Sequence, residues 1–275
     1  GSLDFFKKLG NQEYRIAVYA KDSYDRTHPL SSERIQALQQ VYSKDPAWDR
    51  PTDPKLEARY QRVKAKLLGY VNPKLAVSKF PESDKSVPGH YARAYAYYVG
   101  SYSDKALAEA DALLKLEPHD PYFLELKGQV LLESDRPNEA IAPLREALAG
   151  ANNAPLVASM LGHALVASDT PENTAEAKLM LKAAVNRDND NPFAWYQLGI
   201  IYDREGDQAR AALATAERKN LEGEPKLALA SATMAMRGIP AGSPDYLRAQ
   251  DIVMVSRAEL AKKDKRYRDK DEKKQ

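Results

Sequence analysis

The sequence predicts an all-α protein, a solenoid of stacked helical hairpins with a helical N-terminal extension. The main observation is a small residue that recurs in the same context at Ala94, Gly128, Gly162 and Gly199, at spacings of 34, 34 and 37 residues. A period of this length is typical of proteins whose repeating unit is a pair of helices. One pair cannot bury its apolar face alone, so we expect neighbouring pairs to stack.

The most specific pattern surrounds Gly199. It comprises Pro192, Trp195, Leu198, Gly199 and Tyr202, with Ala211 further along the chain. This pattern resembles the tetratricopeptide repeat (TPR), which implies two antiparallel helices that cross at the small residue. Small residues at the matching positions of the second helices complete the contact: Ala106, Ala110, Ala140, Ala147, Ala177 and Ala184.

The repeat divides the chain into segments. We expect TPR repeats at about 87–120, 121–154, 155–191 and 192–220, capping helices at 221–263 and a charged tail at 264–275. The longer third spacing indicates an insertion around residues 169–173. Asp120-Pro121 and Asn191-Pro192 place a capping residue before a proline at the first helical position. Ser103 is expected to cap a second helix, and Gly206 to end a first helix.

Residues 1–86 do not follow the repeat. We expect helices at Ser31–Val41 and Pro54–Tyr70, and an irregular stretch at Asn72–Pro88. The chain begins Gly1-Ser2 without an initiator methionine, which resembles the remnant of a cleaved purification tag. We therefore expect the natural chain to extend further upstream, and we conclude nothing from the lack of a targeting segment.

Composition narrows the function classes. Charged residues make up 29% of the 275 residues and the net charge is +2, which disfavours a nucleic-acid binder. No uncharged apolar run is long enough to predict a transmembrane segment. The absence of cysteine excludes disulfides, thiolate metal sites and cysteine nucleophiles.

A short motif, T-H-P-x4-R-I, lies at Thr27–Ile35. It resembles a segment of the bacterial zinc metalloproteases of peptidase family 48. Phe5–Leu9 resembles the helix that follows the glutamate zinc ligand in that family, and Gly242–Asp251 is similar to its BepA-like branch. The resemblance implies that residues 1–86 are the end of a protease domain, followed by the C-terminal TPR region.

The zinc site of that family needs an HExxH motif and a downstream glutamate. The histidines of this chain are His28, His90, His119 and His163, and no HExxH is present. We therefore expect no catalytic residue and no cofactor in this chain, whereas zinc is expected in the full-length parent. The resemblance places His28 at the edge of the zinc site when the protease half is present. The alternative is that His28 only positions the start of a helix.

The first helices of TPR arrays line a concave groove. Mapping the groove positions onto this chain gives a largely aromatic set with few charges. Its expected peptide-binding members are Tyr91, Tyr95, Tyr98, Tyr122, Gln129, His163, Phe193, Tyr196 and Arg204, and its other positions are Glu125, Glu133, Leu156, Ser159 and Asp203. Aromatic side chains give a large contact area at low entropic cost, which suits apolar-rich polypeptide. Two alternatives stay open: several tyrosines pack between repeats or against residues 1–86, and His163 is a surface histidine.

Two functions follow. One is the partner-binding region of a periplasmic zinc metalloprotease that acts in outer-membrane protein assembly or quality control, as the resemblance implies. Its partners would be unfolded or partly assembled envelope proteins, or assembly machinery. The other is a stand-alone TPR adaptor with no attached enzyme, in which the match at Thr27–Ile35 is chance. The upstream coding sequence discriminates between the two.

Overall fold

The computed structural model describes residues 3, 5–8, 31–46 and 50–272, and every regular element in these residues is a helix. This confirms the predicted all-α fold class. The chain divides into two compact units, Gly1–Tyr60 and Gln61–Gln275. The boundary lies inside one helix, α3 (Pro54–Val71), and each unit is described here by itself.

The first unit contains α2 (Ser31–Tyr42) and the first turns of α3. The guanidinium carbon of Arg34 on α2 lies 5.7 Å from the centroid of the Phe6 ring. Phe6 also meets the Phe5 ring edge-on, with 5.5 Å between the centroids. Residues 27–30 of the Thr27–Ile35 motif, including His28, lie outside the described residues, and the rest of the motif begins α2.

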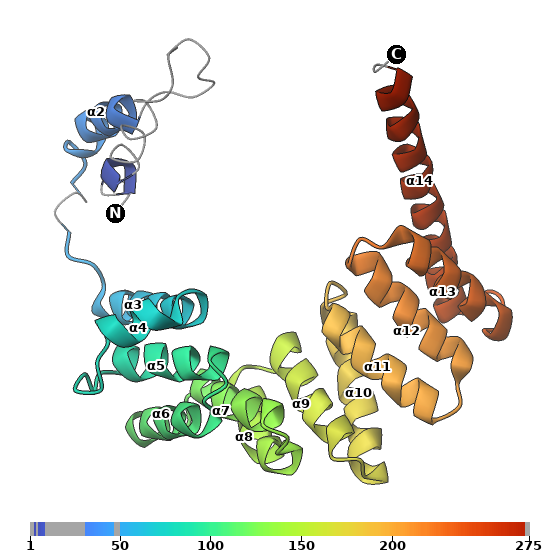
Figure 1. Ribbon diagram of the computed structural model, residues 1–275, viewed down its shortest axis with the longest axis horizontal. Coiled ribbons are helices and arrows are strands. Elements are labelled where there is room, and N and C mark those ends of the chain that lie inside the picture. The colour runs from blue at the N-terminus through green and yellow to red at the C-terminus, as the bar shows by residue number, and fades with distance from the viewer. Residues whose placement is uncertain (1–2, 4, 9–30, 47–49, 273–275) are drawn as a thin grey trace. The chain divides into compact units, whose positions relative to one another are not determined.

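In the second unit, α4 (Pro73–Lys79) follows α3, and the remaining helices pack as consecutive pairs (Figure 1). The first helices of the pairs are α5 (Val87–Val99), α7 (Pro121–Glu133), α9 (Pro155–Ala167), α11 (Pro192–Arg204) and α13 (Pro225–Gly238). The second helices are α6 (Ser103–Leu116), α8 (Pro137–Gly150), α10 (Pro171–Arg187), α12 (Gln208–Leu221) and α14 (Pro244–Glu272). The backbone of α14 thus remains helical through residues 264–272.

The predicted crossings are close at two of the three glycines. A methyl carbon added at Gly162 would lie 2.7 Å from Leu181 Cγ, and one added at Gly128 would overlap the Leu144 side chain. Both glycines therefore let the second helix approach closely. At Gly199 the two helices also cross, but less tightly, because an added methyl carbon would lie 3.7 Å from Ala214 Cβ and 3.9 Å from the Ala211 carbonyl oxygen. The small side chains of α12 leave that crossing open.

The turns between paired helices repeat one backbone conformation. A residue with positive φ occurs at Ser101 (60°), Asp135 (59°), Asp169 (55°) and Gly206 (76°). Gly206 follows α11 as expected. The turn before α10 has the same length as those before α6, α8 and α12, so the three extra residues follow it, in the first part of α10, as predicted. They lengthen α10 to 17 residues where α8 has 14.

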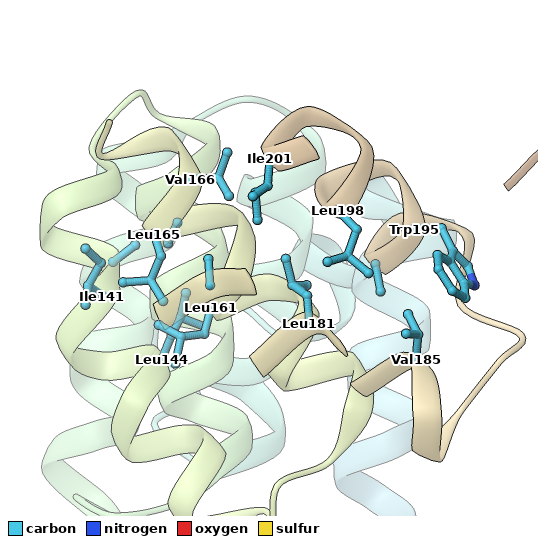
Figure 2. Close-up of a cluster of buried hydrophobic side chains, with 14 of the residues drawn as sticks. Ile141, Leu144, Leu161, Leu165, Val166, Leu181, Val185, Trp195, Leu198 and Ile201 are labelled. Carbon is cyan, nitrogen blue, oxygen red and sulfur yellow. The ribbon is translucent and has the colours of Figure 1, made fainter. Parts of the chain in front are cut away.

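Buried side chains of neighbouring hairpins form a shared core (Figure 2). Its members include Leu144, Leu161, Leu165, Leu181, Val185, Trp195, Leu198 and Ile201, contributed by α8, α9, α10 and α11. Each hairpin thus completes the core of the next, which is the stacking that the repeat period predicts.

The helix starts agree with two of the three predicted caps. Asp120 accepts hydrogen bonds from the backbone nitrogens of Tyr122 and Phe123, and Asn191 accepts one from that of Ala194. The expectation for Ser103 is wrong, because Ser103 is already helical and the cap position, Tyr102, makes no side-chain hydrogen bond.

Residues 61–86 pack with the repeats, although the expected domain boundary follows residue 86. The cause is a row of small residues, in which Gly69 of α3 lies directly against the Ala92 carbonyl of α5. Ala65, Ala76, Ala92 and Ala96 are buried in the same cluster. The stretch Asn72–Pro88, expected to be irregular, contains α4 because Asn72 caps a helix that starts at Pro73.

A buried arginine fixes the loop between α4 and α5. Arg93 is fully buried and donates to both carboxylate oxygens of Glu109, at 2.8 and 2.9 Å. It also donates to the backbone carbonyls of Pro81 and Asp84, each at 2.9 Å. His90 donates to the same carboxylate at 2.5 Å. Burial opposes ionisation of Glu109, yet the hydrogen bonds from Arg93 and His90 lower its pKa.

Candidate functional site

A cleft of about 400 Å³ lies between α3 and four of the first helices, entirely within the second unit. We name it the aromatic cleft. It is lined by Lys66, Leu67 and Tyr70 of α3, Tyr95 of α5, Glu125 and Gln129 of α7, Leu156, Ser159 and Met160 of α9, Asn191, and Phe193 of α11. Of the expected peptide-binding residues, Tyr95, Gln129 and Phe193 are brought together here, with Glu125, Leu156 and Ser159 from the other mapped groove positions.

Tyr91 lies behind the cleft and does not line it. Its side chain is 3% exposed and packs edge-on against Tyr95 and Phe123, with 5.2 Å between each pair of ring centroids. Burial raises the pKa of Tyr91 to about 12 and also raises that of Tyr95. Tyr91 therefore supports the ring of Tyr95 from behind.

Arg62 on α3 joins the extension to the second repeat. It makes two hydrogen bonds of 2.8 Å to the carboxylate of Asp120, the residue that caps α7. Its guanidinium carbon lies 4.3 Å from the centroid of the Phe123 ring and 5.9 Å from that of Tyr122. Tyr122, a predicted groove residue, is thereby placed beside Arg62 outside the cleft, with 53% of its surface exposed.

A hydrogen-bonded chain links α5 and α7 beside the cleft. Gln129 Nε2 donates to the Tyr98 hydroxyl at 2.7 Å, and that hydroxyl donates to the Glu133 carboxylate. Burial, together with the nearby Glu133 carboxylate, raises the pKa of Tyr98. The chain orients the amide of Gln129, which lines the cleft.

His163 lies next to Phe193, with the rings edge-on and 5.3 Å between centroids. Burial lowers the pKa of His163, although Glu133 opposes that shift. His163 is therefore neutral at pH 7 and acts as an aromatic neighbour of Phe193.

Tyr196 belongs to a separate cleft of about 380 Å³ between α11, α12 and α13. Gly199, Ala211 and Thr215 line it, and the guanidinium carbon of Arg218 lies 4.9 Å from the centroid of the Tyr196 ring. The open crossing at Gly199 creates this space. Arg204, predicted for the groove, instead donates to the Val166 carbonyl at 3.1 Å and pairs with Asp169 at 3.1 Å.

Glu125 is the acidic side chain that lines the aromatic cleft, and Lys66 is the basic one. Among the described residues, none donates a hydrogen bond to the Glu125 carboxylate or forms an ion pair with it. Burial raises the pKa of this carboxyl, and the positive charge of Lys66 only partly offsets that effect. The Lys66 ammonium itself lies 5.0 Å from the centroid of the Tyr95 ring.

Sequence reasoning missed the wall of the cleft that α3 forms. Leu67 and Tyr70 are both more than half exposed and both line the cleft. They continue a heptad-spaced series of exposed apolar residues on α3 that starts at Leu56 and includes Tyr60 and Val63. This spacing was visible in the sequence.

The described residues contain neither a metal-binding cluster nor a membrane-spanning helix. No group of three or more histidine, aspartate or glutamate residues there is arranged to hold a metal ion. No described helix is both long and apolar enough to span a bilayer.

No protein-family model and no curated protein matches the chain. Among solved structures, the chain is similar to YrrB, described as a TPR protein with an unusual peptide-binding site, with a TM-score of 0.50 and 18% identity over 72% of this chain and 96% of that one. The MamA protein gives a TM-score of 0.47 and 21% identity over 63% of this chain and 92% of that one. The paired helices, the shared core and the likeness to YrrB show that the chain has a TPR-type helical-hairpin solenoid with a helical N-terminal extension.

Proposed function

We propose that the chain binds segments of other polypeptides in the aromatic cleft. The observation that carries this proposal is the cleft itself, where side chains from five helices converge on one largely apolar space. Leu156, with 68% of its surface exposed, and Phe193, with 41%, are accessible to a ligand. Large apolar side chains left exposed in a concave site favour binding of an apolar-rich partner.

The rigidity of the lining supports the same proposal. Tyr95 is held by Tyr91, Gln129 by Tyr98, and Asn191 by its own capping bond to α11. A site that is already ordered loses little conformational entropy when it binds. The solved structure of YrrB is described as containing a peptide-binding site, which agrees with a polypeptide ligand for this fold.

The test is binding to an immobilised library of 13-residue peptides. We expect Leu156→Ala and Phe193→Ala to weaken binding of the retained peptides roughly tenfold each, as buried apolar anchors do. Leu179→Ala is the matched control, because Leu179 is 75% exposed on α10 and lies outside the cleft. Retention of full affinity by both cleft variants would reject the cleft as the binding site.

We further propose that this binding region serves a BepA-like zinc metalloprotease in the periplasm. The support is the T-H-P-x4-R-I motif at Thr27–Ile35 together with the TPR-type repeats behind it. The test is the natural coding sequence and its product. An upstream HExxH helix with a downstream glutamate, and zinc in the purified full-length protein, would support the proposal. A natural chain without them would reject it.

The stand-alone adaptor is the second candidate. The observation that favours it is that every residue lining the aromatic cleft lies within 61–275, so the cleft needs no residue of the first unit. Under this proposal, residues 61–275 bind the same peptides with the same affinity as the full chain. A large loss of affinity in that fragment, with its helicity retained, would count against the adaptor.

A further inference from the structure

The aromatic cleft contains an acidic group that the fold does not use. Glu125 projects from α7 between the apolar side chains of α3 and α9, and it lines the cleft without a hydrogen bond or ion pair from the described residues. Other carboxylates on these helices are engaged: Asp120 by Arg62, and Glu133 by Tyr98. A partly buried carboxylate without a partner costs free energy, which a ligand of opposite charge recovers on binding.

The surroundings of Glu125 suit a cation more than a neutral donor. The rings of Tyr70, Tyr95 and Phe193 line the same cleft, and aromatic faces attract ammonium and guanidinium groups. The protein already shows this attraction, because the Lys66 ammonium lies 5.0 Å from the Tyr95 ring centroid. Lys66 stays beyond ion-pair distance of Glu125, so the carboxylate is available to a second cation.

We infer that the aromatic cleft selects polypeptide segments with a lysine or arginine between apolar residues, and that Glu125 pairs with that basic side chain. This inference rests on the proposed function of the cleft and specifies its ligand. The apolar neighbours of the basic residue would contact Leu67, Leu156 and Phe193, which line the cleft around the carboxylate. Specificity would come from the ion pair and most of the contact area from the apolar residues.

The experiment uses three acetylated and amidated nine-residue peptides that differ only at the central position. That position is lysine, norleucine or glutamate, flanked by leucine and phenylalanine. For the full chain we expect the lysine peptide to bind roughly tenfold more tightly than the norleucine peptide, and the glutamate peptide to bind most weakly. Glu125→Gln should reduce the ratio of lysine to norleucine affinity to near one.

Two further variants make the test specific to Glu125. Lys66→Met removes the competing cation and should raise the preference for lysine. Glu146→Gln changes the net charge equally but lies on α8, where its carboxylate bonds His119, and should leave the preference unchanged. A preference that survives Glu125→Gln, or one lost equally in Glu146→Gln, would overturn the inference.

The outcome also separates this inference from the proposed function. If the lysine and norleucine peptides bind the full chain equally, and Leu156→Ala weakens both, the charge selection is overturned but the cleft remains a peptide-binding site. Binding of the three peptides that is unchanged by Leu156→Ala and Phe193→Ala would overturn the proposed function. Denaturant titration of each variant shows whether it remains folded.

Discussion

Gly128 faces Leu144 across the crossing of α7 and α8, with no space between them for a methyl group. Gly199 occupies the same position in α11, but there an added methyl group would meet Ala214 Cβ at 3.7 Å and the Ala211 carbonyl oxygen at 3.9 Å, both ordinary contact distances. The two glycines therefore predict opposite effects for one substitution.

We expect Gly128→Ala to lower the free energy of unfolding by about 1–3 kcal/mol, because the side chain of Leu144 must move from its place in the core. Gly199→Ala should raise it by about 0.5–1 kcal/mol, because alanine favours the helix and no neighbour is displaced. Urea titrations of both variants give the two values. Destabilisation by Gly199→Ala would contradict the finding that the α11–α12 crossing has room for an added methyl group.

The buried Arg93 network predicts a second effect. Arg93→Met leaves the Glu109 carboxylate without its main partner and the carbonyls of Pro81 and Asp84 without a donor. Breaking a buried pair in this way should cost about 3–5 kcal/mol. The double variant Arg93→Met with Glu109→Met should recover part of that loss, since no unpaired charge remains. A double variant less stable than Arg93→Met alone would contradict this account.

The repeated turn conformation predicts a third pair of changes. Gly206 has a φ of 76°, so Gly206→Ala should lower the free energy of unfolding by about 1–2 kcal/mol. Ser101 has a φ of 60° at the equivalent turn, so Ser101→Gly should raise the free energy of unfolding by about 0.5 kcal/mol. Glycine relieves the backbone strain, and the greater conformational entropy of glycine in the unfolded chain offsets part of that gain. Thermal melts of the two variants should therefore shift in opposite directions.

Glu125 predicts a dependence of stability on pH. Burial raises its pKa in the folded state, so the folded protein binds this proton more tightly than the unfolded chain does. Its contribution therefore favours folding at low pH and is lost as the pH rises from the ordinary value of 4.5 through the raised pKa. Burial raises the pKa of the neighbouring Tyr91 and Tyr95, so both stay neutral between pH 4 and 7.

We expect Glu125→Gln to be more stable than the unmodified chain at pH 7 and equally stable at pH 4. Urea unfolding at the two pH values measures the difference, and Glu146→Gln again provides the control for net charge. A Gln variant that is less stable at pH 7 would show that the carboxylate has a partner in the folded protein.

Local signals predicted the parts of the fold that depend on neighbours in the sequence. The spacing of Gly128 and Gly162 predicted close helix crossings, and the Asp120-Pro121 dipeptide predicted a capped helix start. The prediction that Ser103 caps a helix failed, because the sequence alone does not distinguish a serine at the cap position from a serine one position inside the helix.

The cleft could be predicted only in part, because its walls come from segments far apart in the chain. The helical phase placed Tyr95, Gln129 and Phe193 on one face. It did not show that α3 closes that face, since this depends on Gly69 meeting α5 and on Arg62 reaching Asp120, 58 residues away. The free carboxylate of Glu125 is likewise visible only once its neighbours are placed.

The longer α10 shows how this architecture accommodates a change in length. Its three extra residues leave the turn at Asp169 unchanged, and at the other end of the helix Arg187 donates to the carbonyl of Asn153 in the preceding hairpin connection, at 2.5 Å. The helices α9 and α11, which line the aromatic cleft, keep the same length of 13 residues. The outer helices can therefore diverge in length and in surface while the cleft side keeps its register, so the two sides of such an array are free to acquire separate roles.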